Sequence, residues 1–141
     1  MAVESTASAV WEGTLKDGRG TVRAASGTFP ELPLTWRQRA ETRDSGTSPE
    51  ELIAAAHASC FAMALSLGLG NSGHPAEKLE TTAQVSFQPG TGITGIHLTV
   101  RGRVQGLDAN AFQEAAEGAK ANCPVSQALA SVPITLSASL G

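Results

Sequence analysis

The stretch from Leu52 to Leu69 reads LIAAAHASCFAMALSLGL, and it decides how the rest of the chain must be arranged. It is apolar and long enough to approach a membrane-spanning helix. However, it is rich in Ala, Ser and Gly, it contains His57 and Cys60, and no Lys or Arg flanks it to anchor a membrane interface. We therefore expect the buried central helix of a soluble protein and no membrane insertion.

The residues on either side define the ends of this helix. Ser48 suits an N-cap, Pro49 suits the first helical position, and the carboxylates of Glu50 and Glu51 complement the positive end of the helix dipole. Gly70 begins the GNSG run that follows Leu69 and is typical of a helix end. The sequence predicts a helix over 49–69, preceded by a loop over 44–48.

Strands are expected on both sides of the helix. Before it, residues 7–16 and 20–25 alternate around Asp17-Gly18, a strong hairpin signal. A third strand is expected over 34–41, with Trp36 on one face and Arg37 and Arg39 on the other. After the central helix we expect strands 80–87 and 93–104 around a Pro89–Gly92 turn, a helix from Asp108 to about Ala121, a short helix from Pro124 to about Ala130, and strand 133–139.

This order, βββ-α-ββ-α-α-β, predicts an α+β fold in which antiparallel sheets wrap around the long central helix. One sheet covers only one side of such a helix, and the second helix is too short to cover the rest. Because soluble monomers avoid large exposed apolar patches, we expect a homodimer. The length of 141 residues fits one domain over 1–141.

Composition excludes several function classes. The net charge of -3 and the absence of a basic run argue against a nucleic-acid or polybasic membrane surface. Aromatic residues make up only 4%, so the chain has few side chains on which nucleic-acid bases could stack. Two cysteines cannot form a disulfide framework, and neither has zinc-site spacing. The N-terminus lacks a secretory signal pattern, so we expect a cytoplasmic protein.

Both cysteines lie in surroundings that permit chemistry. Cys123 precedes Pro124 at an expected helix start, where free backbone N–H groups favour a thiolate. Cys60 lies in the middle of the central helix, where it could also be a small buried hydrophobic residue. One guanidinium, from Arg37 or Arg39, could stabilise a thiolate. Alternatively, both arginines lie on an exposed sheet face.

The helix itself limits which groups can meet. Glu50 lies ten residues before Cys60, which is ~15 Å along a straight helix, so the two do not touch within that helix. Glu50 either orients an arginine or is only a helix-start acid. His57 lies one turn before Cys60 and could act as its base in a hydrolase. The other interpretation of His57 is a core or interface histidine.

The run Ser48-Pro49-Glu50-Glu51-Leu52-Ile53, the following AAAHASCFAMALS and the later ANCPVSQAL resemble the OsmC branch of the OsmC/Ohr family. The opening VWEG, the GRGTV segment and the final PITL strand resemble it as well. This resemblance implies a thiol-dependent peroxidase that reduces organic hydroperoxides in osmotic and oxidative stress. It also implies an intertwined α+β homodimer with two active sites at the subunit interface.

By position, the resemblance implies that Cys60 is the peroxidatic cysteine, Cys123 the resolving cysteine and Glu50 the motif carboxylate. Arg39 fits the motif arginine, with Ala40 where the family has Phe, and Arg37 is the fallback. Cys60 would become a sulfenic acid and then a disulfide with Cys123, which an external dithiol reduces. The resemblance implies lipoyl dithiols as reductants, and no metal or organic cofactor is expected.

An apolar lining from Phe61, Met63 and Leu65 would favour alkyl hydroperoxides over hydrogen peroxide. The alternative function is a non-catalytic dimeric stress or small-ligand-binding protein of the same fold.

Overall fold

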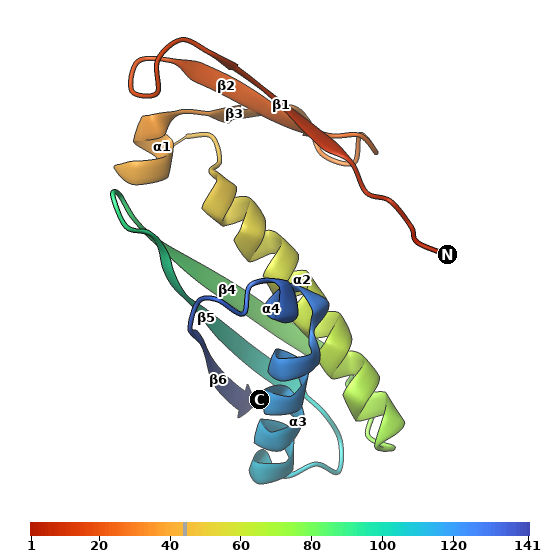
Figure 1. Cartoon of the computed structure of the whole chain (residues 1–141). Helices are drawn as coiled ribbons and strands as arrows, with labels where there is room; N and C mark the ends of the chain where they lie inside the picture. Colours follow the sequence, from red (N-terminus) through yellow and green to blue (C-terminus); the bar gives the residue numbers. More distant parts are fainter. Residues whose placement is uncertain (44) are drawn as a thin grey trace. The chain divides into compact units, whose positions relative to one another are not determined.

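A computed structural model describes residues 1–43 and 45–141 and is shown in Figure 1. It divides into two compact units, Met1–Leu52 and Ile53–Gly141, which are described in turn. Each unit contains a three-stranded sheet. Asp44, the first residue of the loop expected over 44–48, lies outside the described residues. The single domain expected over 1–141 stays a prediction.

The first unit holds an antiparallel sheet of β1 (Ala7–Glu12), β2 (Arg19–Ala24) and β3 (Leu32–Leu34), in that order. The predicted antiparallel pairing of these two strands is confirmed, with Ala7 paired to Ala24 and Glu12 to Arg19. The strand expected over 7–16 ends at Glu12, so a connection over 13–18 replaces the expected tight turn at Asp17-Gly18. β1 is exposed along its whole length, and Val10 and Trp11 are 59% and 40% exposed. Its apolar side chains therefore remain at the surface of the single chain.

The expectation of a strand over 34–41 is wrong. β3 ends at Leu34, and Trp36–Ala40 forms the short helix α1. Thr35 caps this helix, because its Oγ1 accepts a hydrogen bond from the backbone N–H of Gln38 at 3.0 Å. Residues two apart on a helix point about 200° apart, so Arg37 and Arg39 no longer share a face. Arg37 is exposed, whereas Arg39 is partly buried.

The central helix α2 spans Pro49–Asn71, which confirms the prediction and extends it by one half-turn. The Oγ of Ser48 accepts a hydrogen bond from the Glu51 backbone N–H at 3.0 Å, as expected for an N-cap. The hydroxyl of Thr47 donates to Glu51 Oε1 at 2.6 Å. By length and composition alone, α2 could also cross a membrane.

The second unit holds a sheet in the order β4-β5-β6 and the helices α3 and α4 (Figure 1). β4 and β5 are antiparallel, but β5 and β6 are parallel, with Ile96 paired to Ile134. The expectation of purely antiparallel sheets is therefore wrong at β6. The chain leaves β5 and returns through two helices, and such a crossover brings the next strand back in the same direction. The bounds are β4 (Lys78–Gln88), β5 (Gly92–Arg103), α3 (Ala109–Asn122), α4 (Pro124–Ala128) and β6 (Ile134–Leu140).

The core of this unit lies where α2 and α3 meet the sheet. Most of the buried side chains that form it come from three elements: Phe61, Leu65 and Leu69 from α2, Ile96, Leu98 and Val100 from β5, and Phe112, Ala116 and Ala119 from α3. Gly102 on β5 permits this approach, because a Cβ there would lie 2.6 Å from the ring of Phe112. This packing fixes α3, and with it the residue that follows α3, Cys123.

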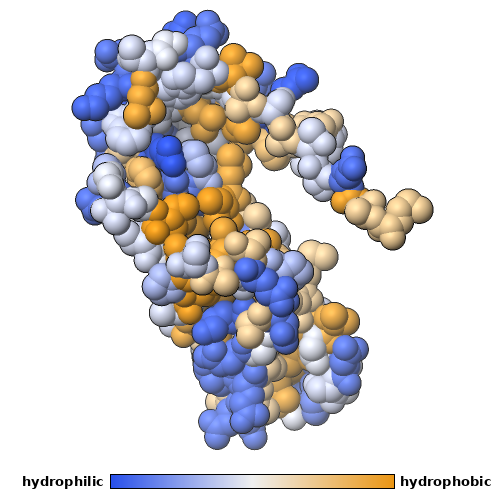
Figure 2. Space-filling view, viewed as in Figure 1, coloured by the Kyte–Doolittle hydropathy of each residue, from blue (hydrophilic) through white to orange (hydrophobic). Residues whose placement is uncertain are grey.

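One side of α2 stays uncovered in the single chain. Met63 and Leu67 are 74% and 66% exposed, and hydrophobic surface is visible in Figure 2. Burying such side chains would contribute roughly 1.5–3 kcal/mol each, so their exposure favours a further partner. The sequence predicts a dimer for the same reason, namely that one sheet and one short helix cannot cover the central helix. The dimer itself stays a prediction.

Candidate active site

Two cysteine thiols meet in the second unit. Cys60 lies in the middle of α2, and Cys123 caps the start of α4, with Pro124 at the first helical position. Both are free thiols, Cys123 is fully buried, and Cys60 is partly exposed. The two side chains are neighbours, close enough for Cys123 to act on the pKa of Cys60. Folding therefore places together two sulfur atoms that are far apart in the sequence.

The surroundings of Cys60 act mainly against its ionisation. Burial raises the pKa of the Cys60 thiol, and the neighbouring Cys123 raises that pKa further. The backbone N–H of Val125, in the first turn of α4, acts in the opposite direction. The free amide at this helix start is thus directed at Cys60, whereas the sequence assigned that influence to Cys123. A nearby cation would be needed to favour the thiolate of Cys60 at neutral pH.

A cation and a carboxylate meet in the first unit. Arg39 on α1 donates from Nε and Nη2 to the two carboxylate oxygens of Glu50, at 3.0 Å each. The Glu50 side chain is 5% exposed, and that of Arg39 is 33% exposed. A two-point contact of this kind fixes the plane of the guanidinium as well as its position. Of the two candidate arginines, Arg39 therefore pairs with Glu50, and Arg37 is exposed.

The four predicted site residues thus form two pairs, one in each compact unit. Arg39 and Glu50 are joined by an ion pair, and Cys60 and Cys123 by a thiol contact. The capping residues Thr35 and Ser48 hold the two helix starts that carry the first pair. The roles implied for all four residues stay predictions.

His57 is a buried core histidine with a partner that sequence reasoning missed. It is fully buried, and its Nε2 lies 2.7 Å from the Oγ of Ser126 on α4. Its Nδ1 is buried and has no hydrogen-bond partner among the residues that the structure describes. The contacts of the ring thus give no support to a Cys60–His57 base pair. No local signal in the sequence identifies this pairing, although His57 lies three residues before Cys60 and Ser126 lies three after Cys123.

The burial of His57 predicts a dependence of stability on pH. Desolvation lowers the pKa of His57 below its usual 6.5. The unfolded chain then binds the proton more readily than the folded chain, so stability is complete above about pH 6.5 and decreases as the pH falls below it. We expect a lower Tm at pH 5.5 than at pH 7.5, measured by calorimetry, and a smaller decrease in His57→Gln.

His74→Gln is the matched control for this measurement, because it removes an imidazole that solvent partly reaches. Its Tm should change with pH as that of the parent does. Equal pH dependence in the parent and in His57→Gln would contradict the prediction.

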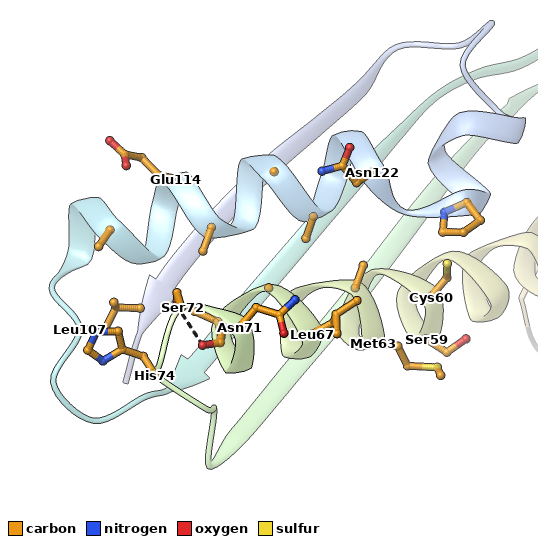
Figure 3. A pocket seen from close by; sticks show the side chains of 18 residues that line it. Ser59, Cys60, Met63, Leu67, Asn71, Ser72, His74, Leu107, Glu114 and Asn122 are labelled. Atoms are coloured by element: carbon orange, nitrogen blue, oxygen red, sulfur yellow. Dashed lines mark hydrogen bonds between the residues drawn. The ribbon is translucent and has the colours of Figure 1, made fainter.

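A groove of about 1370 Å³ runs between α2 and α3, with Cys60 at one end and His74 and Leu107 at the other (Figure 3). Met63 lines this groove, as expected. Phe61 and Leu65 do not, because both point into the core and are fully buried. The expectation that all three form an apolar lining is therefore wrong for two of them. The other apolar lining residues include Ala64, Leu67 and Ala115.

Comparison with known proteins adds to this geometry. A family model described as OsmC-like protein matches residues 42–137. The chain is also 46% identical over 132 residues, 92% of either sequence, to Peroxiredoxin OsmC of Escherichia coli K12 and to the Shigella flexneri protein of the same name. The chain belongs to the OsmC-like family.

Solved structures place this OsmC-like chain in the same fold. OhrB of Bacillus subtilis, an organic hydroperoxide resistance protein, superposes with a TM-score of 0.71 at 26% identity, covering 96% of this chain and 98% of the other. An OsmC-like protein from Mycoplasma pneumoniae superposes with a TM-score of 0.74 over 99% of both chains. Because the identity is 17%, this likeness concerns the fold alone. The predicted α+β fold of the OsmC/Ohr family is confirmed.

Within residues 1–43 and 45–141, no three His, Cys, Asp or Glu side chains are grouped so that they could hold a metal ion. Among the titratable groups that the structure brings together are the thiol pair and the Arg39–Glu50 ion pair. The guanidinium of Arg39 is of the kind that can stabilise a thiolate. That no metal or cofactor is required stays a prediction.

Proposed function

We propose that this protein is a thiol-dependent peroxidase that reduces organic hydroperoxides to alcohols. The observation that carries the proposal is the contact between the Cys60 and Cys123 side chains. Relatives at 46% identity are named peroxiredoxins, which supports a peroxidase, and OhrB is named for resistance to organic hydroperoxides. A role in oxidative and osmotic stress defence follows from the same relationship.

The proposed reaction uses the two sulfur atoms in turn. The Cys60 thiolate attacks the distal oxygen of the hydroperoxide, the O–O bond breaks, and the alkoxide takes up a proton and leaves as the alcohol. Cys60 is then a sulfenic acid. The thiol of Cys123 attacks that sulfur, the S–O bond breaks, water leaves and a disulfide forms. An external dithiol supplies two electrons and two protons to restore both thiols.

Arg39 and Glu50 are proposed to ionise Cys60 and to polarise the peroxide. A guanidinium beside the thiol would offset the burial that raises the pKa of Cys60. The contact with Glu50 holds Arg39 in one orientation, which suits donation to an oxygen that gains charge as the O–O bond breaks. The alkyl part of the substrate is proposed to occupy the apolar groove that begins at Cys60.

The partners proposed here follow from the same chemistry. A homodimer would cover the exposed apolar side chains of α2 and β1, with two active sites at its interface as the family resemblance implies. The reductant is proposed to be a dithiol, with a lipoylated protein as one source. We place the protein in the cytoplasm, with no metal, organic cofactor, nucleic acid or membrane as partner.

Peroxide consumption tests the proposal directly. The protein is mixed with cumene hydroperoxide and dithiothreitol or dihydrolipoamide, and the remaining peroxide is followed over time. We expect many turnovers per chain, and a loss of two hydrogens in intact mass when peroxide is added without dithiol. Consumption at the rate of buffer, with unchanged mass, would contradict the proposal and favour a non-catalytic binding protein.

A further inference from the structure

Two side-chain contacts join the same two segments of the second unit. Cys60 on α2 contacts Cys123 at the start of α4. Three residues away along each segment, His57 Nε2 lies 2.7 Å from Ser126 Oγ. Residues three apart on a helix lie on one face, so α2 presents His57 and Cys60 together to the α4 segment. The His57–Ser126 bond therefore lies beside the thiol contact and joins the same two elements.

Burial makes this bond an effective connection. His57 and Ser126 are 0% and 5% exposed, so water does not readily replace either partner. The Ser126 hydroxyl can donate or accept, so either neutral form of the imidazole makes the contact. Nδ1 has no hydrogen-bond partner in the described part of the chain, which leaves Nε2 as the polar connection of this ring.

The segment that carries Cys123 is held on one side by α3 and by the packing of Val125 and Leu129 against the core, and Ser126 adds a buried side-chain hydrogen bond to α2. α4 contains five residues, all described, and among them only Ser126 is buried. Within the turn, the Gln127 N–H donates to the Cys123 carbonyl at 3.0 Å, so a displacement of Ser126 would be transmitted to Cys123. A single-turn helix has marginal stability of its own and depends on contacts with its neighbours.

We propose that His57 and Ser126 are positioning residues that hold Cys123 against Cys60, and thereby favour disulfide formation over further oxidation of Cys60. This inference rests on the peroxidase function proposed above. Neither residue has a part in the attack on the hydroperoxide, since His57 Nε2 is engaged by Ser126. Both act through the placement of α4.

The chemistry gives the Cys60 sulfenic acid two fates. In one, the Cys123 thiol attacks the sulfur, an S–S bond replaces the S–O bond, and water leaves. In the other, a second hydroperoxide transfers its distal oxygen to the sulfur, which becomes a sulfinic acid, and a second alcohol leaves. The first rate depends on how well Cys123 is held, because an oriented neighbour acts at a high effective concentration. The second depends on the peroxide concentration.

Ser126→Ala and Ser126→Thr form the first test, because the first removes the hydroxyl and the second keeps it. Each full-length variant receives increasing cumene hydroperoxide without reductant, and intact mass gives the ratio of disulfide to sulfinic acid. We expect that ratio to fall about tenfold in Ser126→Ala, the change that corresponds to loss of one buried hydrogen bond. The ratio should recover in Ser126→Thr, and the rate of the first oxidation of Cys60 should stay close to that of the parent in both.

His57→Gln and His57→Asn form an independent pair on the other side of the bond. The amide nitrogen of glutamine reaches the place of Nε2 and can still contact Ser126, whereas that of asparagine is too short. We expect a parent-like ratio in His57→Gln and a reduced ratio in His57→Asn. If Ser126→Ala does not fold, this pair still tests whether the His57–Ser126 bond positions Cys123.

The results separate this inference from the function on which it rests. If the parent forms a disulfide and both Ser126→Ala and His57→Asn keep its ratio, the positioning role is overturned. If the first oxidation slows by the same factor as disulfide formation, the residues are merely structural, and the role is again overturned. If the parent itself forms neither disulfide nor sulfinic acid, the peroxidase function fails and this inference falls with it.

Discussion

Cys60→Ser is expected to reduce peroxide consumption to the rate of buffer, whereas Cys123→Ser is expected to undergo one oxidation of Cys60 and then to be inactivated. The reason is the order of the two sulfurs in the proposed reaction. Without the Cys60 thiolate no nucleophile reaches the peroxide oxygen, since a serine hydroxyl is not ionised at neutral pH. Without Cys123 the sulfenic acid of Cys60 forms but has no internal thiol to condense with.

Intact mass distinguishes the two variants. Cys123→Ser should gain one oxygen quickly and a second more slowly as excess peroxide converts the sulfenic acid to a sulfinic acid. Cys60→Ser should show neither change, and the parent should lose two hydrogens. Parent-like turnover in Cys123→Ser with esters as substrates would favour the Cys60–His57 hydrolase instead. Parent-like peroxide turnover in Cys60→Ser would exclude Cys60 as the peroxidatic residue.

Arg39→Ala should lower kcat/KM for organic hydroperoxides by about 10²–10³-fold, the usual cost of losing one preorganised donor to developing charge. The same variant should raise the pKa of Cys60, because burial and Cys123 already raise that pKa and no guanidinium would then oppose them. The pKa is measured as the pH dependence of alkylation of Cys60 in a Cys123→Ser background.

Arg37→Ala is the matched control, because Arg37 lies two residues earlier on the same short helix and is exposed. It should keep nearly full activity. Arg39→Ala also leaves the buried carboxylate of Glu50 without its cation, so its Tm is compared with that of Arg39→Ala combined with Glu50→Gln. Loss of activity in Arg37→Ala and not in Arg39→Ala would reverse the assignment.

Mixing two inactive variants shows which subunit supplies the guanidinium in the proposed dimer. Cys60→Ser and Arg39→Ala chains are unfolded together and refolded. If Arg39 serves the partner's Cys60, each mixed dimer contains one complete site, and about a quarter of parent activity returns when the chains pair at random. If Arg39 serves its own chain, no site is complete and the mixture stays inactive.

The central helix could be predicted from sequence because its signals are local. Ser48 and Pro49 mark its start. The burial expected from its apolar composition is met only on the side that faces the core, since Met63 and Leu67 are exposed. The short helix α1 was missed although Thr35 and Gln38 have the spacing of a capping box, since alternation of Trp36 with its polar neighbours favoured a strand. In the structure the Gln38 N–H donates to Thr35 Oγ1 and caps a helix at this place. The helix, unlike a strand, puts Arg37 and Arg39 on different faces.

Long-range contacts of the site could not be read from spacing. The parallel pairing of β6 with β5 depends on the path of the chain through α3 and α4, and no single residue signals it. The meeting of His57 with Ser126 depends on the same path. The family resemblance identified Cys60 and Cys123 from the residues next to each of them in the sequence. That the two side chains are neighbours depends instead on the packing of the core, which includes Phe61 and Phe112.

The wide sequence separation of the two touching thiols has a thermodynamic consequence. If they join, the covalent link closes a large loop of chain and removes many conformations from the unfolded ensemble, which stabilises the native state by about 4 kcal/mol. The oxidised protein would then resist heat and denaturant better than the reduced one. Each turnover would alternate between a form that is more stable and one that is less stable against unfolding. Resistance to unfolding would then report what fraction of the molecules carries the disulfide and awaits reduction.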